Sequence, residues 1–118
     1  MKIAIQVMAP PYSYQDMDSA IKIAEAALNK GHEVAIFLFA DAVNAANSRV
    51  KPIRVDRNIP KKLEELIKEK GLRVDICGLC MEYRGLAEEA LIEGARFSGL
   101  PELAKLIAES DRFLSFSA

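Results

Sequence analysis

Residues 3–8 (IAIQVM) and 33–39 (EVAIFLF) are two nearly continuous apolar runs, and residues 17–30 between them carry apolar side chains at helical spacing. An apolar run of this length is typical of a strand that is buried on both faces of a sheet. Two such strands joined by a helix are expected to pair in parallel. This stretch therefore predicts an α/β fold.

The same alternation of strands and helices continues to the end of the chain. Asp18 or Ser19 is expected to cap the helix over 17–30, and Asp41 a short helix over 42–47. The whole pattern predicts a single domain over residues 1–118, with one five-stranded, mostly parallel sheet and helices on both of its faces. The further elements expected are strands at 73–77, 95–98 and 112–117, helices at 60–70, 86–92 and 100–109, and one or two helical turns within 78–84.

Composition and charge exclude several classes of function. The chain of 118 residues has a formal net charge of −1, so no global field favours nucleic acid or an anionic membrane. No apolar run approaches the roughly 20 residues needed to cross a bilayer. The chain starts with a strand-like pattern instead of a signal sequence, and we therefore expect a cytoplasmic protein.

The two cysteines, Cys77 and Cys80, are the most distinctive chemical feature of the sequence. Cys77 ends a predicted strand, and helical turns are expected to begin at Gly78. Ligands of open α/β sheets bind at the carboxyl ends of the strands. Backbone N–H groups there favour an anion, and the thiolate is the nucleophilic form of cysteine. Cys80 could share or resolve a sulfur carried by Cys77, and Arg84 is a candidate for holding an anionic sulfur.

Other interpretations of the cysteines stay open. A strand followed by C-x-x-C and a helix is also the arrangement of thiol oxidoreductases, which makes a dithiol redox module an alternative. Both cysteines could instead be apolar fillers of the core. Zinc is not expected, because a structural site requires four ligands and His32, the only other strong candidate, lies at the opposite end of a strand.

The loop over residues 9–16 follows the first strand and is rich in polar groups. It contains no glycine, so it does not support a phosphate-binding loop. Tyr12, Gln15 and Asp16 either belong to a capping loop or form one wall of the cysteine site. A basic segment at 49–57 is interpreted as a solvated loop, with a docking patch for an acidic partner as the less favoured possibility.

Several of these segments together resemble the DsrE/TusD-like (DsrE/DsrF-like) sulfur-relay family, and the C-x-x-C with a following Arg-Gly resembles its two-cysteine subgroup. The segments that carry the resemblance are Pro11-Tyr12, Gln15–Ala20, Gly31–Val34, Phe37–Val43, Ala46-Asn47, Cys77, Arg84-Gly85 and Asp111–Phe113. The resemblance implies a three-layer α/β/α sandwich and assembly into homotrimers or hexamers. It also implies that Cys77 accepts a persulfide sulfur from a donor protein and passes it to an acceptor protein.

The sequence therefore predicts a sulfur carrier or sulfurtransferase with its persulfide on Cys77. Cys80 is the second catalytic candidate, and the supporting residues are Arg84, Gly78, Tyr12, Gln15, Asp16 and Asp41. No cofactor, no metal, no direct nucleic-acid contact and no membrane contact are expected. The alternatives are a dithiol redox module that uses Cys77 and Cys80, and a non-catalytic oligomeric scaffold.

Overall fold

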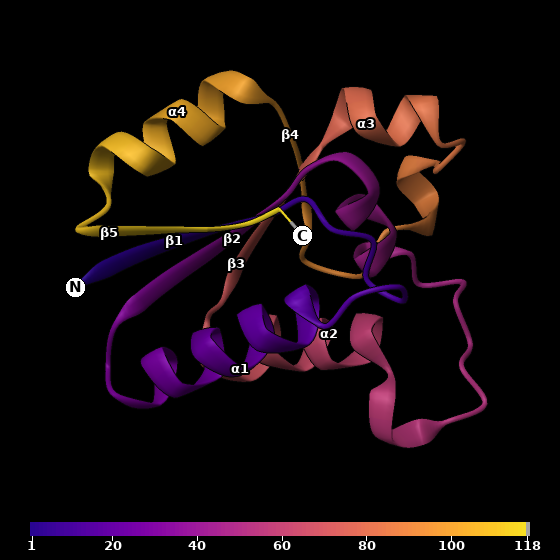
Figure 1. Ribbon diagram of the computed structural model, residues 1–118, viewed down its shortest axis with the longest axis horizontal. Helices are drawn as coiled ribbons and strands as arrows, with labels where there is room; N and C mark the ends of the chain where they lie inside the picture. Colours follow the sequence, from indigo (N-terminus) through magenta and orange to yellow (C-terminus); the bar gives the residue numbers. More distant parts are fainter. Residues whose placement is uncertain (118) are drawn as a thin grey trace.

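The computed structural model of the protein describes residues 1–117 and contains five strands and four α-helices (Figure 1). Three short 3-10 helices lie in the connections between them. The elements in chain order are β1 (Lys2–Val7), α1 (Asp16–Asn29), β2 (Glu33–Leu38), η1 (Ala40–Ala46), η2 (Val55–Arg57), α2 (Ile59–Lys70), β3 (Arg73–Cys77), α3 (Gly78–Tyr83), η3 (Glu88–Ala90), β4 (Arg96–Ser98), α4 (Leu100–Glu109) and β5 (Arg112–Phe116).

The five strands form one sheet in the order β4-β3-β2-β1-β5, and every neighbouring pair is parallel. Helices α1 and α2 cover one face of the sheet, while α3 and α4 lie on the other (Figure 1). The predicted three-layer α/β/α sandwich with a five-stranded sheet is confirmed. Because all strands run in the same direction, their carboxyl ends share one edge of the sheet.

The core lies between the central strands and the helices packed on them. Val7, Leu38 and Ile76 are completely buried near the carboxyl ends of β1, β2 and β3. Met17 of α1 and Leu63 of α2 are equally buried. Central strands that are covered on both faces are apolar almost throughout, which explains the continuous apolar runs in the sequence.

Helices α2 and α4 lie where the sequence predicted them, whereas the side-chain caps expected for two other helices are not found. Gly71 caps α2 in the left-handed conformation (φ 76°), as expected of a glycine at this position. Neither Asp18 nor Ser19 caps α1, which begins at Asp16 without a side-chain cap. Asp41 does not cap a helix either, because η1 starts one residue before it.

The segment over 86–92 is not the helix that the sequence predicted. Only Glu88–Ala90 form a 3-10 turn, and the residues on either side of it are extended. The backbone of this segment is hydrogen-bonded to residues 46–48, at and just after the end of η1, instead. Ser48 N donates to Ala90 O at 2.7 Å and Ile92 N donates to Ala46 O at 2.9 Å. These long-range hydrogen bonds replace the i to i+4 bonds of a helix.

Asp75 of β3 is a buried carboxylate inside the sheet, with an exposed fraction of 1%. Arg73 donates to its two oxygens at 2.9 and 3.0 Å, and Ser98 Oγ donates at 2.9 Å from the edge strand β4. A buried carboxylate is tolerated when it is paired and hydrogen-bonded in this way. The hydrogen bond from Ser98 to Asp75 links β4, a strand of only three residues, to β3.

Over residues 1–117, none of the helices combines the length and the apolar character that crossing a membrane requires.

We expect Ser98→Ala to lower the free energy of unfolding by about 2 kcal/mol, because it removes a hydrogen bond to a buried carboxylate. Denaturant unfolding of the purified protein measures this change. Ser115→Ala is the matched control, since Ser115 is exposed on the opposite edge strand. The control should change the free energy by no more than about 0.5 kcal/mol. An equal effect of the two substitutions would contradict the role given to Ser98.

Candidate functional site

The two cysteines lie at the carboxyl edge of the sheet, where β3 continues directly into α3. Cys77 is the last residue of β3 and the N-cap of α3, and its Sγ accepts the backbone N–H of Cys80 at 3.4 Å. Cys77 is buried, with an exposed fraction of 4%, whereas Cys80 is only partly buried. Both are free thiols. The absence of any loop between β3 and α3 is what places the two thiols side by side.

Burial raises the pKa of the Cys77 thiol, and a hydrogen bond with the Cys80 side chain raises it further. The backbone N–H groups of Cys80 and Leu79 act in the opposite direction. The amide donors that the sequence indicated are therefore present, but the cost of burying a charge outweighs them. Cys77 consequently holds its proton more firmly than an exposed cysteine does.

Ala40 supplies a donor to the second sulfur that the sequence analysis missed. Its backbone N–H points at Cys80 Sγ, with a distance of 3.3 Å between nitrogen and sulfur. Among the described residues, Ala40 is the only non-glycine residue with a positive φ, at 54°. This conformation costs an L-residue roughly 1–2 kcal/mol. The sequence contains no signal for it, because alanine has no intrinsic preference for the left-handed region.

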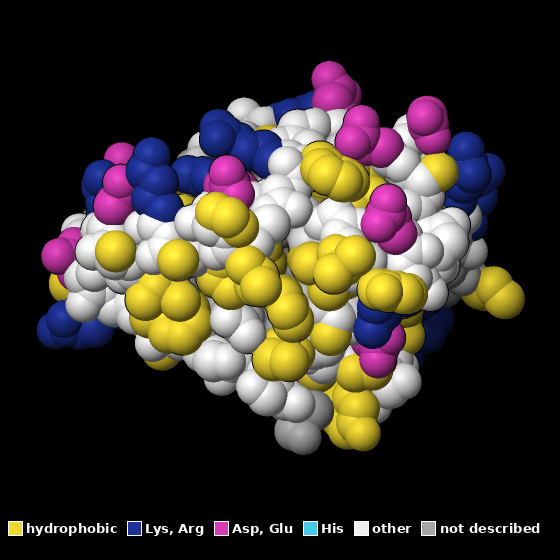
Figure 2. All heavy atoms as spheres, turned by 90° about the horizontal axis from the view of Figure 1, so that it is seen from above, with side chains coloured by type: hydrophobic (Ala, Val, Ile, Leu, Met, Phe, Trp, Pro, Cys, Tyr) yellow, Lys and Arg dark blue, Asp and Glu magenta, His cyan; other side chains and the backbone are white. Residues whose placement is uncertain are grey.

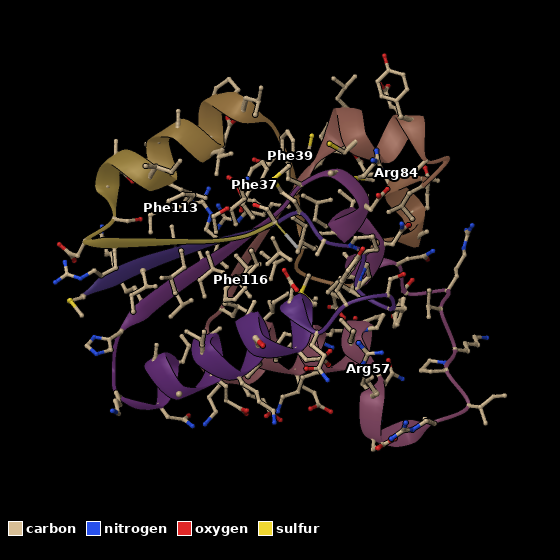
Figure 3. The ribbon with its side chains drawn as sticks, viewed as in Figure 1. Phe37, Phe39, Arg57, Arg84, Phe113 and Phe116 are labelled. Carbon is tan, nitrogen blue, oxygen red and sulfur yellow. The ribbon has the colours of Figure 1, made fainter. Side chains whose placement is uncertain are left out.

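Arg84 connects α3 to the turn that follows β2. Its Nε donates to Asp41 Oδ1 at 2.7 Å, and its Nη1 donates to the carbonyl oxygen of Cys80 at 3.0 Å. Figure 3 shows Arg84 beside α3, on the upper side of the sheet in that view. The structure thus brings Arg84 and Asp41 together at the backbone of Cys80. The anion that pairs with Arg84 is the Asp41 carboxylate.

Gly78 is needed for a close approach between α3 and the edge strand. A Cβ atom placed on Gly78 would lie 2.2 Å from Cζ of Phe97 in β4, well inside van der Waals contact. The phenyl ring therefore occupies the place where a side chain would be. Gly78 is a packing residue next to Cys77, and it lets β4 approach the start of α3.

Tyr12 and Gln15 lie in a different hollow, which they share with Arg57. The Arg57 guanidinium stands 5.9 Å from the centre of the Tyr12 ring and donates to Pro11 O at 2.9 Å. Burial raises the pKa of Tyr12, and the positive charge of Arg57 partly counteracts this. Neither cysteine lines this hollow. Figure 3 shows Arg57 below the sheet beside α2, well separated from Arg84. The third polar residue named from this loop, Asp16, is the first residue of α1.

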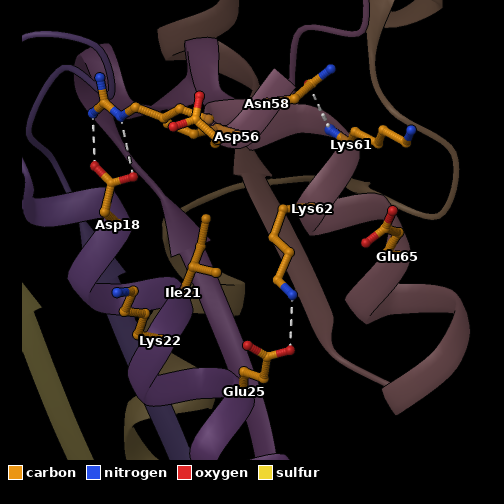
Figure 4. Close-up of a pocket in the computed structure, with 11 residues that line it drawn as sticks. Asp18, Ile21, Lys22, Glu25, Asp56, Asn58, Lys61, Lys62 and Glu65 are labelled. Atoms are coloured by element: carbon orange, nitrogen blue, oxygen red, sulfur yellow. Dashed lines mark hydrogen bonds and ion pairs between the residues drawn. The ribbon is translucent and has the colours of Figure 1, made fainter. Parts of the chain in front are cut away.

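The basic segment over 49–57 has acidic neighbours in the folded chain. Arg57 forms an ion pair with Asp18 at 2.7 Å, and Arg54 pairs with Asp56 at 2.6 Å. Figure 4 shows the groove between α1 and α2, where one further ion pair, Lys62 with Glu25 at 2.9 Å, crosses from one helix to the other. These pairings favour the interpretation of a solvated loop over that of a docking patch for an acidic partner.

His32 lies in the turn before β2, at the opposite edge of the sheet from the cysteines. Its Nδ1 lies 2.9 Å from the backbone nitrogen of Met1. Over residues 1–117, no three His, Cys, Asp or Glu side chains are gathered closely enough to hold a metal ion.

Comparisons with known proteins find a matching family model, similar sequences and a similar structure. The DsrE/DsrF-like family model matches residues 1–116. DsrE of Allochromatium vinosum is 32% identical, and the match covers 98% of each chain. Sulfurtransferase TusD of Salmonella paratyphi B is 30% identical over 98% of this chain and the whole of the relative. The crystal structure of YchN from E. coli superposes with a TM-score of 0.89 at 29% identity, covering 98% of this chain and 99% of that chain.

Ala40→Gly should raise the free energy of unfolding by about 0.5–1 kcal/mol, because glycine adopts a positive φ without steric cost. Ala42→Gly is the matched control in the same short helix, where the alanine is fully buried. The control should lower the free energy by about 1 kcal/mol or more. Thermal or denaturant unfolding compares the two. A destabilised Ala40→Gly variant would show that Ala40 is not strained.

The raised pKa of Cys77 predicts slow alkylation at neutral pH. Only the thiolate reacts, so the rate in a Cys80→Ser variant should keep rising with pH beyond the ordinary thiol pKa of about 8.5. Burial, the main cause of the shift, remains in that variant. Rates of iodoacetamide labelling across a pH series give the midpoint. A midpoint at or below that of free cysteine would contradict the assignment.

Proposed function

This chain belongs to the DsrE/DsrF-like family, and we propose that it is a sulfur carrier that accepts a persulfide sulfur at Cys77 and passes it on. Relatives named as sulfurtransferases support a role in sulfur transfer. The observation that carries the assignment to Cys77 is its place in the fold. Cys77 is a free thiol at the carboxyl end of β3, with backbone N–H groups directed at its sulfur.

The proposed reaction is an exchange between two sulfurs. A thiolate attacks the outer sulfur of a donor persulfide, the sulfur–sulfur bond of the donor breaks, and the donor leaves as a thiolate. The reverse attack by an acceptor thiolate then removes the sulfur again. Neither step changes the total number of electrons, so the exchange requires no cofactor and no metal.

Protein partners follow from this role as donor and acceptor of the sulfur. We also propose a single DsrE-like domain that assembles as a homotrimer or hexamer in the cytoplasm, without direct contacts to nucleic acid or membrane. Figure 2 shows apolar side chains gathered across the face formed by α3 and α4. Leu79 and Tyr83 of α3 and Leu100 of α4 are among the exposed apolar residues. An exposed apolar surface of this kind supports contacts with other protein chains.

One observation favours a second candidate function, a dithiol redox module. The two cysteines are both free, and Cys77 Sγ accepts the backbone N–H of Cys80 at 3.4 Å, so the two residues are in direct contact. Two thiols in such contact could be oxidised to a disulfide, in which case the protein would exchange electrons instead of sulfur atoms.

Mass spectrometry distinguishes these functions. After incubation with a persulfide donor, the wild-type chain should gain the mass of one sulfur atom, and reduction should remove it. Cys77→Ser should hold no stable sulfur, since the proposed storage site is lost, while Leu79→Ala serves as a control in the same turn. A wild-type chain that loses two hydrogens instead would support the redox module. An unchanged mass, with a known carrier loaded in parallel, would contradict the proposal and leave the non-catalytic scaffold.

A further inference from the structure

The two sulfurs differ in how a donor can reach them. Cys77 is 4% exposed and lies against the core, whereas Cys80 is partly exposed on α3. Cys80 packs against the core from α3, but its neighbours Leu79 and Tyr83 have exposed fractions of 61% and 81%, so this part of α3 faces solvent. A donor protein that carries a persulfide on a cysteine would therefore meet the sulfur of Cys80 before that of Cys77.

The sulfur of Cys80 also has a donor of its own. The N–H of Ala40 is directed at Cys80 Sγ from the end of β2, at 3.3 Å. A backbone N–H in this position stabilises negative charge on the sulfur, both in an attacking thiolate and in a leaving thiolate. Ala40 keeps this orientation at the cost of a positive φ, which is characteristic of functional sites. Hydrogen bonds hold both of its neighbours: Phe39 N donates to Val7 O at 2.9 Å, and Asp41 accepts from Arg84.

The position of Cys80 is fixed from the other side by Arg84. The guanidinium bridges the carbonyl oxygen of Cys80 and the Asp41 carboxylate, and so ties α3 to the same turn that contains Ala40. The Cys80 sulfur and its N–H donor therefore belong to one hydrogen-bonded unit, although they are 40 residues apart in the chain.

We propose that Cys80 is the first acceptor of the sulfane sulfur from a persulfide donor, and that Cys77 takes this sulfur from Cys80 and stores it. The inference rests on the proposed function and adds an order to the two cysteines. It names a cysteine persulfide as the donor class, and it gives Ala40 the role of stabilising the Cys80 sulfur through its N–H.

Two exchanges make up the sequence of events. The Cys80 thiolate attacks the outer sulfur of the donor persulfide, whose sulfur–sulfur bond breaks, and the donor leaves as a thiolate. The Cys77 sulfur then attacks the same outer sulfur on Cys80. The bond from Cys80 Sγ to that sulfur breaks, the electron pair returns to Cys80 Sγ, and the proton lost by Cys77 moves to Cys80. One sulfur atom has moved, and nothing is oxidised or reduced overall.

The properties of Cys77 suit storage better than first acceptance. Burial raises the pKa of its thiol, so little thiolate is present to attack a donor in solution. Cys80, whose backbone N–H donates to Cys77 Sγ at 3.4 Å, is adjacent and can take the proton locally. Once the sulfur is on Cys77, the same burial shields it from thiols in the surrounding solution.

Time-resolved mass spectrometry with glutathione persulfide as the donor tests this order. Cys77→Ser should still gain one sulfur atom on Cys80 at about the wild-type initial rate, although the adduct is exposed and lost quickly to added thiol. Cys80→Ser should load Cys77 roughly tenfold more slowly, because the direct route needs a buried, protonated thiol. Leu79→Ala, between the two cysteines, is the control that changes the same turn without removing a sulfur and should load at the wild-type rate. Cys80→Ala repeats the measurement should the serine variant fail to fold.

Several outcomes would overturn the order. Loading of Cys77 at the wild-type rate in both Cys80 variants would show that Cys77 receives the sulfur directly. Release of sulfide with formation of a Cys77–Cys80 disulfide would show that Cys80 resolves the persulfide instead of delivering it. The first result would leave the proposed carrier function intact. The second would leave the sulfur chemistry at Cys77 intact. A wild-type chain that never gains sulfur would instead remove the proposed function, and this inference with it.

Discussion

Leu38 and Ile76 are paired in register near the carboxyl ends of β2 and β3, and the candidate site depends on that parallel pairing. The chain leaves both strands at the same edge of the sheet, so the turn after β2 meets the first turn of α3. The contact from Ala40 N–H to Cys80 Sγ follows from this register. An antiparallel pairing would place the two turns at opposite edges and would separate the sulfur from its donor.

At Cys77, the same architecture produces two opposing effects. Direct continuation of β3 into α3 directs backbone N–H groups at the sulfur, which favours the thiolate, while the three layers around the strand end remove water, which favours the thiol. Desolvation is the larger effect. Cys80, three residues further along the chain, is only partly buried. The difference between the two cysteines thus arises from depth in the fold and not from residue type.

The polar residues named from the sequence are divided by the sheet into two groups. Asp41 and Arg84 meet at the backbone of Cys80, although the sequence suggested a helix cap for the first and an anion-binding group for the second. Tyr12 joins Arg57 instead, and the Asp18 carboxylate completes that cluster. Loops at the same edge of a sheet can lead to either of its faces, and spacing along the chain does not determine which face each loop joins.

The sequence by itself determined the strand and helix order, the parallel sheet, the ends of helices at glycines such as Gly71, and the position of Cys77 at a strand end. These features depend on local periodicity and on backbone preferences of single residues, which the sequence states directly. Only the tertiary structure decided the positive φ of Ala40, the extended path around Glu88–Ala90 and the direction in which the pKa of Cys77 is shifted. Each of these depends on contacts between segments about 40 residues apart or on the depth of burial, and neither is encoded in a local pattern.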